Sequence, residues 1–224
     1  FKDYIQENPI VVKTVISTLA VLAIIWGFVE CHYTVRVLDD ANVARDNAFP
    51  VGKRLTELAK DSKNQFQETI FSVSNLQSDD LPTIAPQNVL WARHQHVFAG
   101  LSWQESKERY YQQMYYQGLD ENWLENTLRN GDFVSMIALF GWGRHTDRLS
   151  SQAKPLTYRE VNEEAKKYGE YIKNFSIKEA TNPKLSYIIL PSSWVEANNE
   201  KFDFTNLDKW YERDNGERVG EYLL

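Results

Sequence analysis

Two histidines separated by a single residue, His94 and His96, have the spacing in this sequence that best fits ligand chemistry. They follow the apolar run 88–92, which has the composition of a buried strand, and α/β folds place ligand sites beyond the ends of their strands. Alternate side chains of a strand face the same side, so both imidazoles could approach one ligand or metal ion. A metal would need a third ligand, such as His145 or Asp79. This spacing is more often found in two polar residues at a strand end than in a metal site, so we predict no metal ion and no cofactor. Because the two histidines follow a predicted strand, we keep them as the candidate ligand site.

The segment Gly141–His145 is a second candidate site, because glycines on both sides of Trp142 are followed by Arg144 and His145. Backbone amides and the Arg144 guanidinium could hold a phosphate or a carboxylate. The spacing matches neither the dinucleotide-binding glycine pattern nor the phosphate-binding loop of nucleotide hydrolases. The alternative is a structural loop that returns a buried element to the surface.

Aromatic side chains are concentrated in the segment 102–118, which carries Trp103 and tyrosines at positions 110, 111, 115 and 116. Aromatic faces stack on sugar rings, so Trp103 and Trp142 are candidate ligand contacts. Tyrosines at helical spacing more often pack a helix against a sheet or near a membrane, and we predict packing for these tyrosines. The charged residues Glu105, Glu108 and Arg109 are expected to be solvated.

The sequence contains no serine nucleophile elbow, no His-Glu-x-x-His motif and no Cys-x-x-Cys pair, and we predict no catalytic residue. The single cysteine, Cys31, excludes an intrachain disulfide and a thiolate zinc cluster. The net charge of -6 argues against a nucleic-acid partner, which needs a basic face. Hydrophobic residues make up 42% of the 224 residues and charged residues 25%, which are the values of a folded globular chain.

The run from Ile10 to Val29 contains one charged residue, Lys13. About 20 residues, at a rise of about 1.5 Å each, form a helix about 30 Å long, the thickness of the hydrocarbon core of a bilayer. The stem of Lys13 can reach the headgroups at one end, and Trp26 and Tyr33 have the position of interfacial aromatics at the other. We therefore predict a transmembrane helix with the anchoring residues Ile10, Lys13, Leu22, Ile25, Trp26 and Val29.

Two other interpretations of this run are weaker. A buried core helix rarely runs this long without a polar face. A cleaved signal peptide or a lipoprotein signal needs small residues before its cleavage point, and the sequence around Cys31 lacks them. The chain begins at Phe1 and ends inside the strand-like run 218–224, so we expect it to be a fragment of a longer protein.

The remaining sequence has the pattern of a small α/β domain, with helices packed in two or three layers on a mixed sheet. We expect residues 1–33 to be the transmembrane helix and its flanks, 34–52 a juxtamembrane connector with a turn at 49–52, and 53–224 the soluble domain. The predicted helices are 53–63, 102–118, 121–129 and 157–174, the last three with capping residues, and the predicted strands are 68–74, 88–92, 185–190 and 218–224. The run 133–140 fits a buried helix or a buried strand, 78–82 is predicted to be a loop, and 202–210 a loop with weak helical character.

Several pieces of the sequence together carry a family resemblance: Ile10–Val29, Arg54–Leu58, Thr69–Val73, Val89–Trp91, Phe98–Ser102, Glu105–Tyr116, Tyr187–Leu190, Trp210–Glu212 and Gly220–Leu224. In this order they resemble the C-terminal end of bacterial multi-spanning membrane proteins of the GT-C glycosyltransferase-like type. In those proteins a last transmembrane helix leads into a soluble α/β tail. The catalytic acid of GT-C enzymes lies in loops near the first membrane helices. Nothing here corresponds to those loops, so no catalytic residue is carried over.

The resemblance implies an extracytoplasmic domain, further transmembrane helices upstream, and a lipid-linked sugar or related envelope substrate. The Lys and Arg residues between 36 and 54 would instead place the domain in the cytoplasm, but folded domains translocate largely regardless of such charges. We therefore expect a non-catalytic, extracytoplasmic tail; any enzymatic residues would lie outside this sequence. The alternatives are a single-pass glycan-binding module and, less favoured, a metal-dependent hydrolase centred on His94, His96 and His145.

Overall fold

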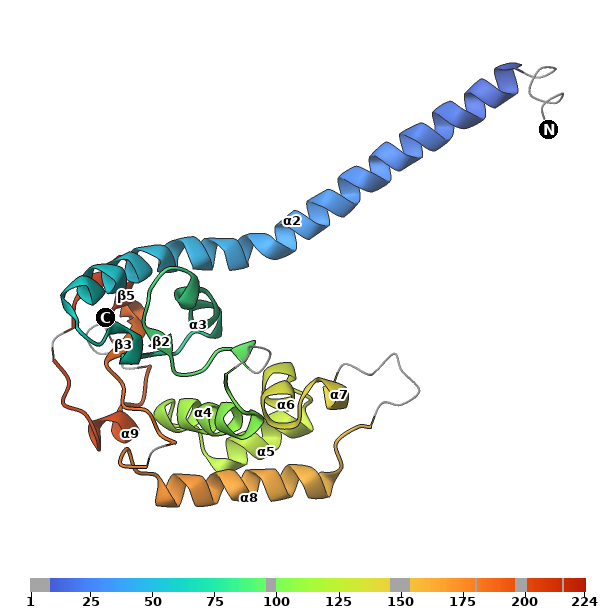
Figure 1. Cartoon of the computed structure of the whole chain (residues 1–224). Coiled ribbons are helices and arrows are strands. Elements are labelled where there is room, and N and C mark those ends of the chain that lie inside the picture. Colours follow the sequence, from blue (N-terminus) through green and yellow to red (C-terminus); the bar gives the residue numbers. More distant parts are fainter. Residues whose placement is uncertain (1–8, 96–99, 146–153, 180, 196–200, 215) are drawn as a thin grey trace. The chain divides into compact units, whose positions relative to one another are not determined.

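The computed structural model describes residues 9–95, 100–145, 154–179, 181–195, 201–214 and 216–224. By its internal contacts the chain divides into two compact units, Phe1–Ala44 and Arg45–Leu224. The second unit is an α/β domain with a five-stranded sheet, as the sequence predicts (Figure 1).

The first unit consists, where it is described, of the N-terminal part of helix α2 (Pro9–Asp61). Its stretch Pro9–Arg36, 28 residues, is long and apolar enough to cross a membrane, as predicted. The large side chains of this stretch are exposed, and Ile24, Trp26 and Phe28 each show 70% or more of their surface. Such exposure is contrary to the alternative of a buried core helix and agrees with a segment that lipid covers.

The predicted turn at 49–52 and the predicted start of a helix at residue 53 are wrong, because α2 continues to Asp61 with Pro50 inside it. Proline in a helix interior costs about 3 kcal/mol, since it removes a hydrogen bond and clashes with the preceding turn. Four apolar side chains of this part of α2 recur at helical spacing and are buried: Ala48, Val51, Leu55 and Ala59. Burying a Val or Leu side chain contributes about 1.5–3 kcal/mol, so this apolar face outweighs the proline.

The sheet of the second unit is mixed, as predicted, with the strand order β2-β1-β3-β5-β4. Its strands are β1 (Thr69–Ser72), β2 (Asn88–Val89), β3 (Tyr187–Pro191), β4 (Arg218–Val219) and β5 (Tyr222–Leu223). β1 is parallel to both neighbours, and Ile70 lies opposite Val89 of β2 and Tyr187 of β3. β5 is antiparallel to both β3 and β4.

Helical segments cover both faces of the sheet, which makes the domain three-layered. Ile70 and Ile189 belong to an apolar cluster with residues of the C-terminal part of α2. The next residues along the same strands, Phe71 and Leu190, belong to a cluster with residues of α4 (Trp103–Tyr116). This alternation is the two-residue period expected of strands that are buried on both faces.

A further apolar cluster joins α4 to α5 (Glu121–Arg129), α6 (Phe133–Phe140) and α8 (Tyr158–Asn174), which lie together in Figure 1. Both predicted capping boxes are present, between Ser102 and Glu105 at α4 and between Thr157 and Glu160 at α8. The run 133–140, for which helix and strand were both open, is the helix α6, capped by Asp132.

Three short segments differ from the expectations. The predicted loop 78–82 lies in α3 (Asn75–Asp80) and a following 3₁₀ turn (Leu81–Thr83). The predicted strand 218–224 is the β4–β5 hairpin, because Gly220 adopts a φ of 62° that reverses the chain. The predicted strand 88–92 is paired only over Asn88–Val89. The remaining short helices in the described part of the chain are α7 (Trp142–His145), α9 (Thr205–Asp208) and two 3₁₀ helices, Gln65–Gln67 and Ser192–Trp194.

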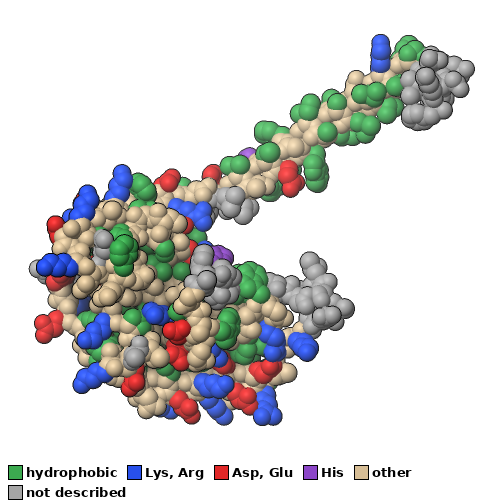
Figure 2. Space-filling model, viewed as in Figure 1, with side chains coloured by type: hydrophobic (Ala, Val, Ile, Leu, Met, Phe, Trp, Pro, Cys, Tyr) green, Lys and Arg blue, Asp and Glu red, His purple; other side chains and the backbone are tan. Residues whose placement is uncertain are grey.

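The two units differ in the side chains that they present. Figure 2 shows apolar side chains along the helix of the first unit. On the visible face of the second unit, Lys and Arg side chains are interspersed with Asp and Glu side chains. The absence of a nucleic-acid partner stays a prediction.

Candidate ligand-binding site

The structure describes one of the two paired histidines. His94 follows β2 and has an exposed side chain, whereas His96 and the side chain of His145 lie outside the described part of the chain. Asp79, the other possible third metal ligand, accepts hydrogen bonds from the backbone amide of Arg93 at 2.8 Å and from its Nε at 2.6 Å. Among the described residues, no group of three His, Cys, Asp or Glu is arranged to hold a metal ion. The site at His94 and His96, and the hydrolase hypothesis, therefore stay predictions.

Trp103 and Trp142 pack near each other where α4 and α7 begin. The Trp103 ring lies against Gly141, because a Cβ on that glycine would be 3.5 Å from the ring carbon Cη2. Trp142 packs edge-to-face on Phe133, with ring centroids 5.5 Å apart. Trp103 is 42% exposed and Trp142 39%, so part of each indole remains accessible to a ligand.

The Arg144 guanidinium is bonded within the chain. It donates to both carboxylate oxygens of Glu160 at 2.8 and 2.9 Å, and to the carbonyl groups of Lys154 and Pro155. Hydrogen bonding from Arg144, together with that from Thr157, lowers the pKa of Glu160 to about 2. This contact joins α7 to the first turn of α8, and an anion at Arg144 would have to displace Glu160.

The tyrosines of α4 form part of the core, as predicted. Tyr110, Tyr111, Tyr115 and Tyr116 are each at most 6% exposed. The Tyr110 hydroxyl lies 2.8 Å from that of Ser135, and burial raises the pKa of Tyr110. The aromatic composition of α4 thus reflects packing on the sheet and on the neighbouring helices.

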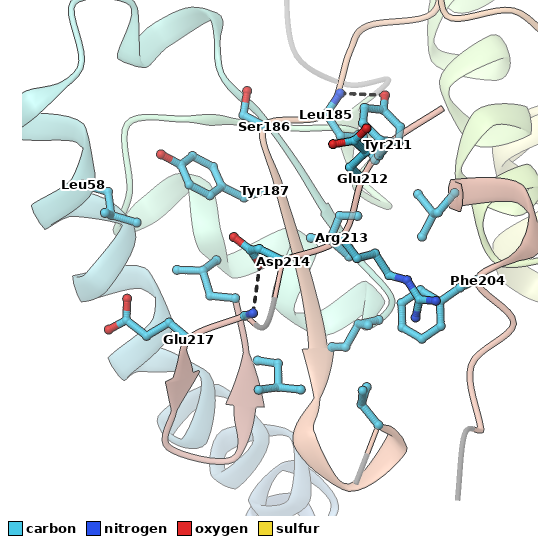
Figure 3. Close-up of a pocket in the computed structure, with 17 residues that line it drawn as sticks. Leu58, Leu185, Ser186, Tyr187, Phe204, Tyr211, Glu212, Arg213, Asp214 and Glu217 are labelled. Carbon is cyan, nitrogen blue, oxygen red and sulfur yellow. Dashed lines mark hydrogen bonds between the residues drawn. The ribbon is translucent and has the colours of Figure 1, made fainter. Parts of the chain in front are cut away.

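A cavity of about 980 Å³ lies beside β3, α9 and the β4–β5 hairpin (Figure 3). Its charged groups are largely engaged within the chain, since Arg213 pairs with Asp208 at 2.8 Å and Glu217 with Arg54 at 2.8 Å. The Arg213 guanidinium also lies over the ring of Phe204, 4.2 Å from its centroid. Ion pairs within the chain therefore already satisfy much of the charge that lines this cavity.

A second cavity, of about 770 Å³, is lined by both apolar and polar residues, and His94 is one of them. Small-molecule sites in proteins have volumes of roughly 300–1,000 Å³, so it can hold a ligand. β1, β2, α3 and α4 contribute to its walls, whereas Trp103, Trp142 and Arg144 do not line it. Its further polar residues include the carboxylate of Asp79 together with Thr69, Thr83, Gln87, Asn88, Gln95 and Arg109.

Three residues of this second cavity carry buried polar atoms without a hydrogen-bond partner among the described residues: Gln87 Oε1, Gln95 Oε1 and Arg109 Nε. Gln87 is 2% exposed, and its Nε2 donates to the Leu55 carbonyl at 2.9 Å and to Glu68 at 3.3 Å. These two acceptors fix the orientation of the Gln87 amide. Buried polar atoms without partners are rare, and three of the six such atoms among the described residues belong to this cavity, which makes it the best candidate site.

Arg109 is the residue of this cavity that the sequence analysis misjudged. It was expected to be a solvated helix charge, but burial lowers the pKa of its guanidinium, and the Glu105 carboxylate opposes that shift. Arg109 shares a helix face with Gln112 and Tyr116, which are both 0% exposed. Only Tyr116 of these three residues is apolar, so the sequence carries no clear signal that Arg109 is buried.

Comparisons of the chain with protein-family models, with curated proteins and with solved structures found no match. The functional proposals therefore rest on the geometry of this chain and on the resemblance in its sequence.

Proposed function

We propose that this chain is a membrane-anchored, extracytoplasmic domain: the non-catalytic tail of a GT-C glycosyltransferase-like protein, which shapes or covers the site of a lipid-linked sugar or related envelope substrate. The observation that carries the proposal is the exposed apolar helix Pro9–Arg36. At about 1.5 Å per residue this stretch is about 42 Å long, enough for the hydrocarbon core of a bilayer and part of its headgroup layers. The bilayer and upstream transmembrane helices of the same protein are its proposed partners.

The exposed side chains of this stretch support a lipid environment. They include Ile16, Leu19, Leu22, Ile24 and Ile25, each more than half exposed. Transfer of one such side chain from water to an apolar medium is favourable by about 1.5–3 kcal/mol. Together, these five side chains favour the bilayer by roughly 10 kcal/mol.

Membrane extraction tests the anchor. Leu22→Arg places a charge near the middle of the apolar stretch, where it costs about 2.5–3.5 kcal/mol of insertion free energy. Val35→Arg places the same charge beside the end of the stretch, next to Arg36, and is the matched control. We expect the unmodified chain and Val35→Arg to resist alkaline carbonate extraction and Leu22→Arg to be released in larger amount. Release of the unmodified chain by carbonate would refute the anchor.

Thiol labelling tests the proposed side of the membrane. Cys31 is the single cysteine, so Cys31→Ser removes all thiols of the chain. Lys178→Cys then introduces one thiol at an exposed position of the domain. A membrane-impermeant maleimide should label this variant in intact spheroplasts. Labelling only after the membrane is permeabilised would place the domain in the cytoplasm.

A single-pass anchored ligand-binding module is the second candidate, and the cavity with the unpartnered polar atoms of Gln87, Gln95 and Arg109 favours it. The two candidates differ in whether further transmembrane helices precede this chain in the full protein. The sequence encoded upstream distinguishes them, because several further apolar segments support the GT-C-like tail, and none supports the single-pass module.

A further inference from the structure

Arg109 brings a positive charge to the second cavity, and no acidic side chain among the described residues bonds to it. Asp79 also lines this cavity, and the acidic side chains of this part of the fold each accept hydrogen bonds within the chain. Asp79 accepts two hydrogen bonds from Arg93, and Glu105 accepts the backbone amide and the hydroxyl of Ser102 at 2.9 and 2.7 Å. Glu108 accepts the side-chain amide of Gln104 at 2.8 Å. A partly buried guanidinium without an anion is unfavourable, and an anionic ligand would compensate it.

The two glutamines of the cavity specify a second feature of the ligand. Gln87 Oε1 and Gln95 Oε1 are hydrogen-bond acceptors without donors. The Gln87 amide cannot simply turn over, because its Nε2 is held by the Leu55 carbonyl and by Glu68. A ligand that satisfies Gln87 Oε1 must carry donors of its own, such as hydroxyl groups. An anion that has only acceptor oxygens would leave this oxygen unpaired.

A carboxylate fits the positive charge better than a phosphate does. A guanidinium binds a carboxylate through two parallel hydrogen bonds, and one Arg matches one negative charge. Phosphate sites typically use several backbone amides at a helix N-terminus. The N-cap residues of the two helices beside this cavity, Ser74 of α3 and Ser102 of α4, do not line it.

We propose that this cavity is a binding site for a small monocarboxylate that carries several hydroxyl groups, of the sugar-acid class. The Arg109 guanidinium binds the carboxylate, and Gln87 and Gln95 accept hydrogen bonds from ligand hydroxyls. Thr69, Thr83 and Asn88 supply further polar groups of the cavity wall. This site deepens the ligand-binding role proposed above. Its test is separable from the membrane anchor, because carbonate extraction does not depend on the cavity.

Calorimetric titration of the full chain in detergent tests the site with four probes: D-glucuronate, D-glucose, acetate and inorganic phosphate. We expect glucuronate to bind. Glucose lacks the charge and therefore loses one charge-assisted hydrogen bond, and acetate lacks the hydroxyls and therefore loses two neutral hydrogen bonds. Each should bind at least about tenfold more weakly than glucuronate. Equal affinity for glucuronate and glucose, tighter binding of phosphate, or no binding of glucuronate would each overturn the proposal.

Variants locate the binding. Arg109→Met should lower the glucuronate affinity about ten- to hundredfold, because it removes a charge-assisted hydrogen-bond pair. Arg159→Met is the matched control, since Arg159 lies on α8 with an 87% exposed side chain and pairs with Glu163. Gln95→Leu is a second variant that leaves Arg109 in place, and it should weaken glucuronate more than acetate. Unchanged glucuronate affinity in a folded Arg109→Met or Gln95→Leu variant contradicts the assignment.

Discussion

Lys107 on α4 and Glu164 on α8 form an ion pair in the interior of the domain, with 2.5 Å between Nζ and Oε1. Both side chains are largely buried, with exposed fractions of 15% and 4%. The Tyr111 hydroxyl donates a hydrogen bond to the same carboxylate oxygen, and burial followed by the nearby Glu164 charge raises the pKa of Tyr111. The three residues therefore form a satisfied polar network between two helices of the apolar core.

Removing one member of this network should be more harmful than removing the pair. Glu164→Leu leaves the Lys107 ammonium buried without a counter-charge, and such changes cost about 3–5 kcal/mol. The double variant Lys107→Met/Glu164→Leu replaces the pair with apolar groups and should recover most of that loss. Urea unfolding of the full chain in detergent, followed by tryptophan fluorescence, measures both. A double variant that is no more stable than Glu164→Leu alone would contradict this account, because the loss would then not come from an unpaired Lys107 charge.

Glu160 predicts a dependence of stability on pH. Its pKa is lowered from 4.5 to about 2, first by the Arg144 hydrogen bond and then by those from Thr157. A carboxyl group with a lowered folded-state pKa stabilises the fold fully above its unfolded pKa and loses this contribution as pH falls. Glu160→Gln keeps a capping side chain and loses the charge. Its deficit in melting temperature should be present at pH 7 and should shrink between about pH 4.5 and 2. A deficit that does not change with pH would mean that hydrogen bonds alone, and not charge, hold α7 to α8.

Gly52 allows α2 to approach the segment after α3. A Cβ at this position would lie 2.8 Å from Cγ2 and 3.1 Å from Cβ of Ile84. The gain in helix propensity from Gly52→Ala is about 1 kcal/mol, whereas overpacking costs about 1–3 kcal/mol, so we expect a net destabilisation of about 1 kcal/mol. Gly143→Ala is the control, since nothing lies within 4 Å of its added Cβ. Equal effects of the two substitutions on urea unfolding would contradict this packing.

Local signals in the sequence were sufficient to predict several elements. The helix starts at Ser102 and Thr157 followed from capping-box spacing, because these hydrogen bonds join residues three apart and need no tertiary partner. The alternating β-branched and aromatic residues around Ile70, and the apolar run around Ile189 that ends at Pro191, marked two strands of the sheet. The length of the apolar run from Ile10 onward was enough to predict a helix that could span a membrane.

The remainder depended on contacts that sequence spacing does not specify. Pro50 is a helix breaker by local rules, and the burial of Val51 and Leu55 against the sheet overrides it. Gly220 was predicted to lie inside one strand, 218–224. It instead forms, with Glu221, the two-residue turn of a hairpin. Arg109 resembles any exposed helix arginine until the walls of the cavity are assembled from segments far apart in the sequence. This last case explains why the candidate site was only partly predicted, through His94.

Arg109 should limit the stability of the unliganded protein. Its guanidinium is partly desolvated, and among the described residues its Nε has no partner, so Arg109→Met removes an unfavourable charge and keeps much of the apolar stem. Because the side chain is only partly buried, we expect a gain of at most about 1 kcal/mol, below the 1–4 kcal/mol reported for fully buried ion pairs replaced by apolar groups. Thermal unfolding of the unliganded full chain should show a melting temperature equal to or above that of the unmodified protein. Glu164→Leu is the comparison variant, because it creates an unpaired buried charge and should lower the melting temperature. A clear fall in the melting temperature of Arg109→Met would indicate that Arg109 serves the fold and not a ligand.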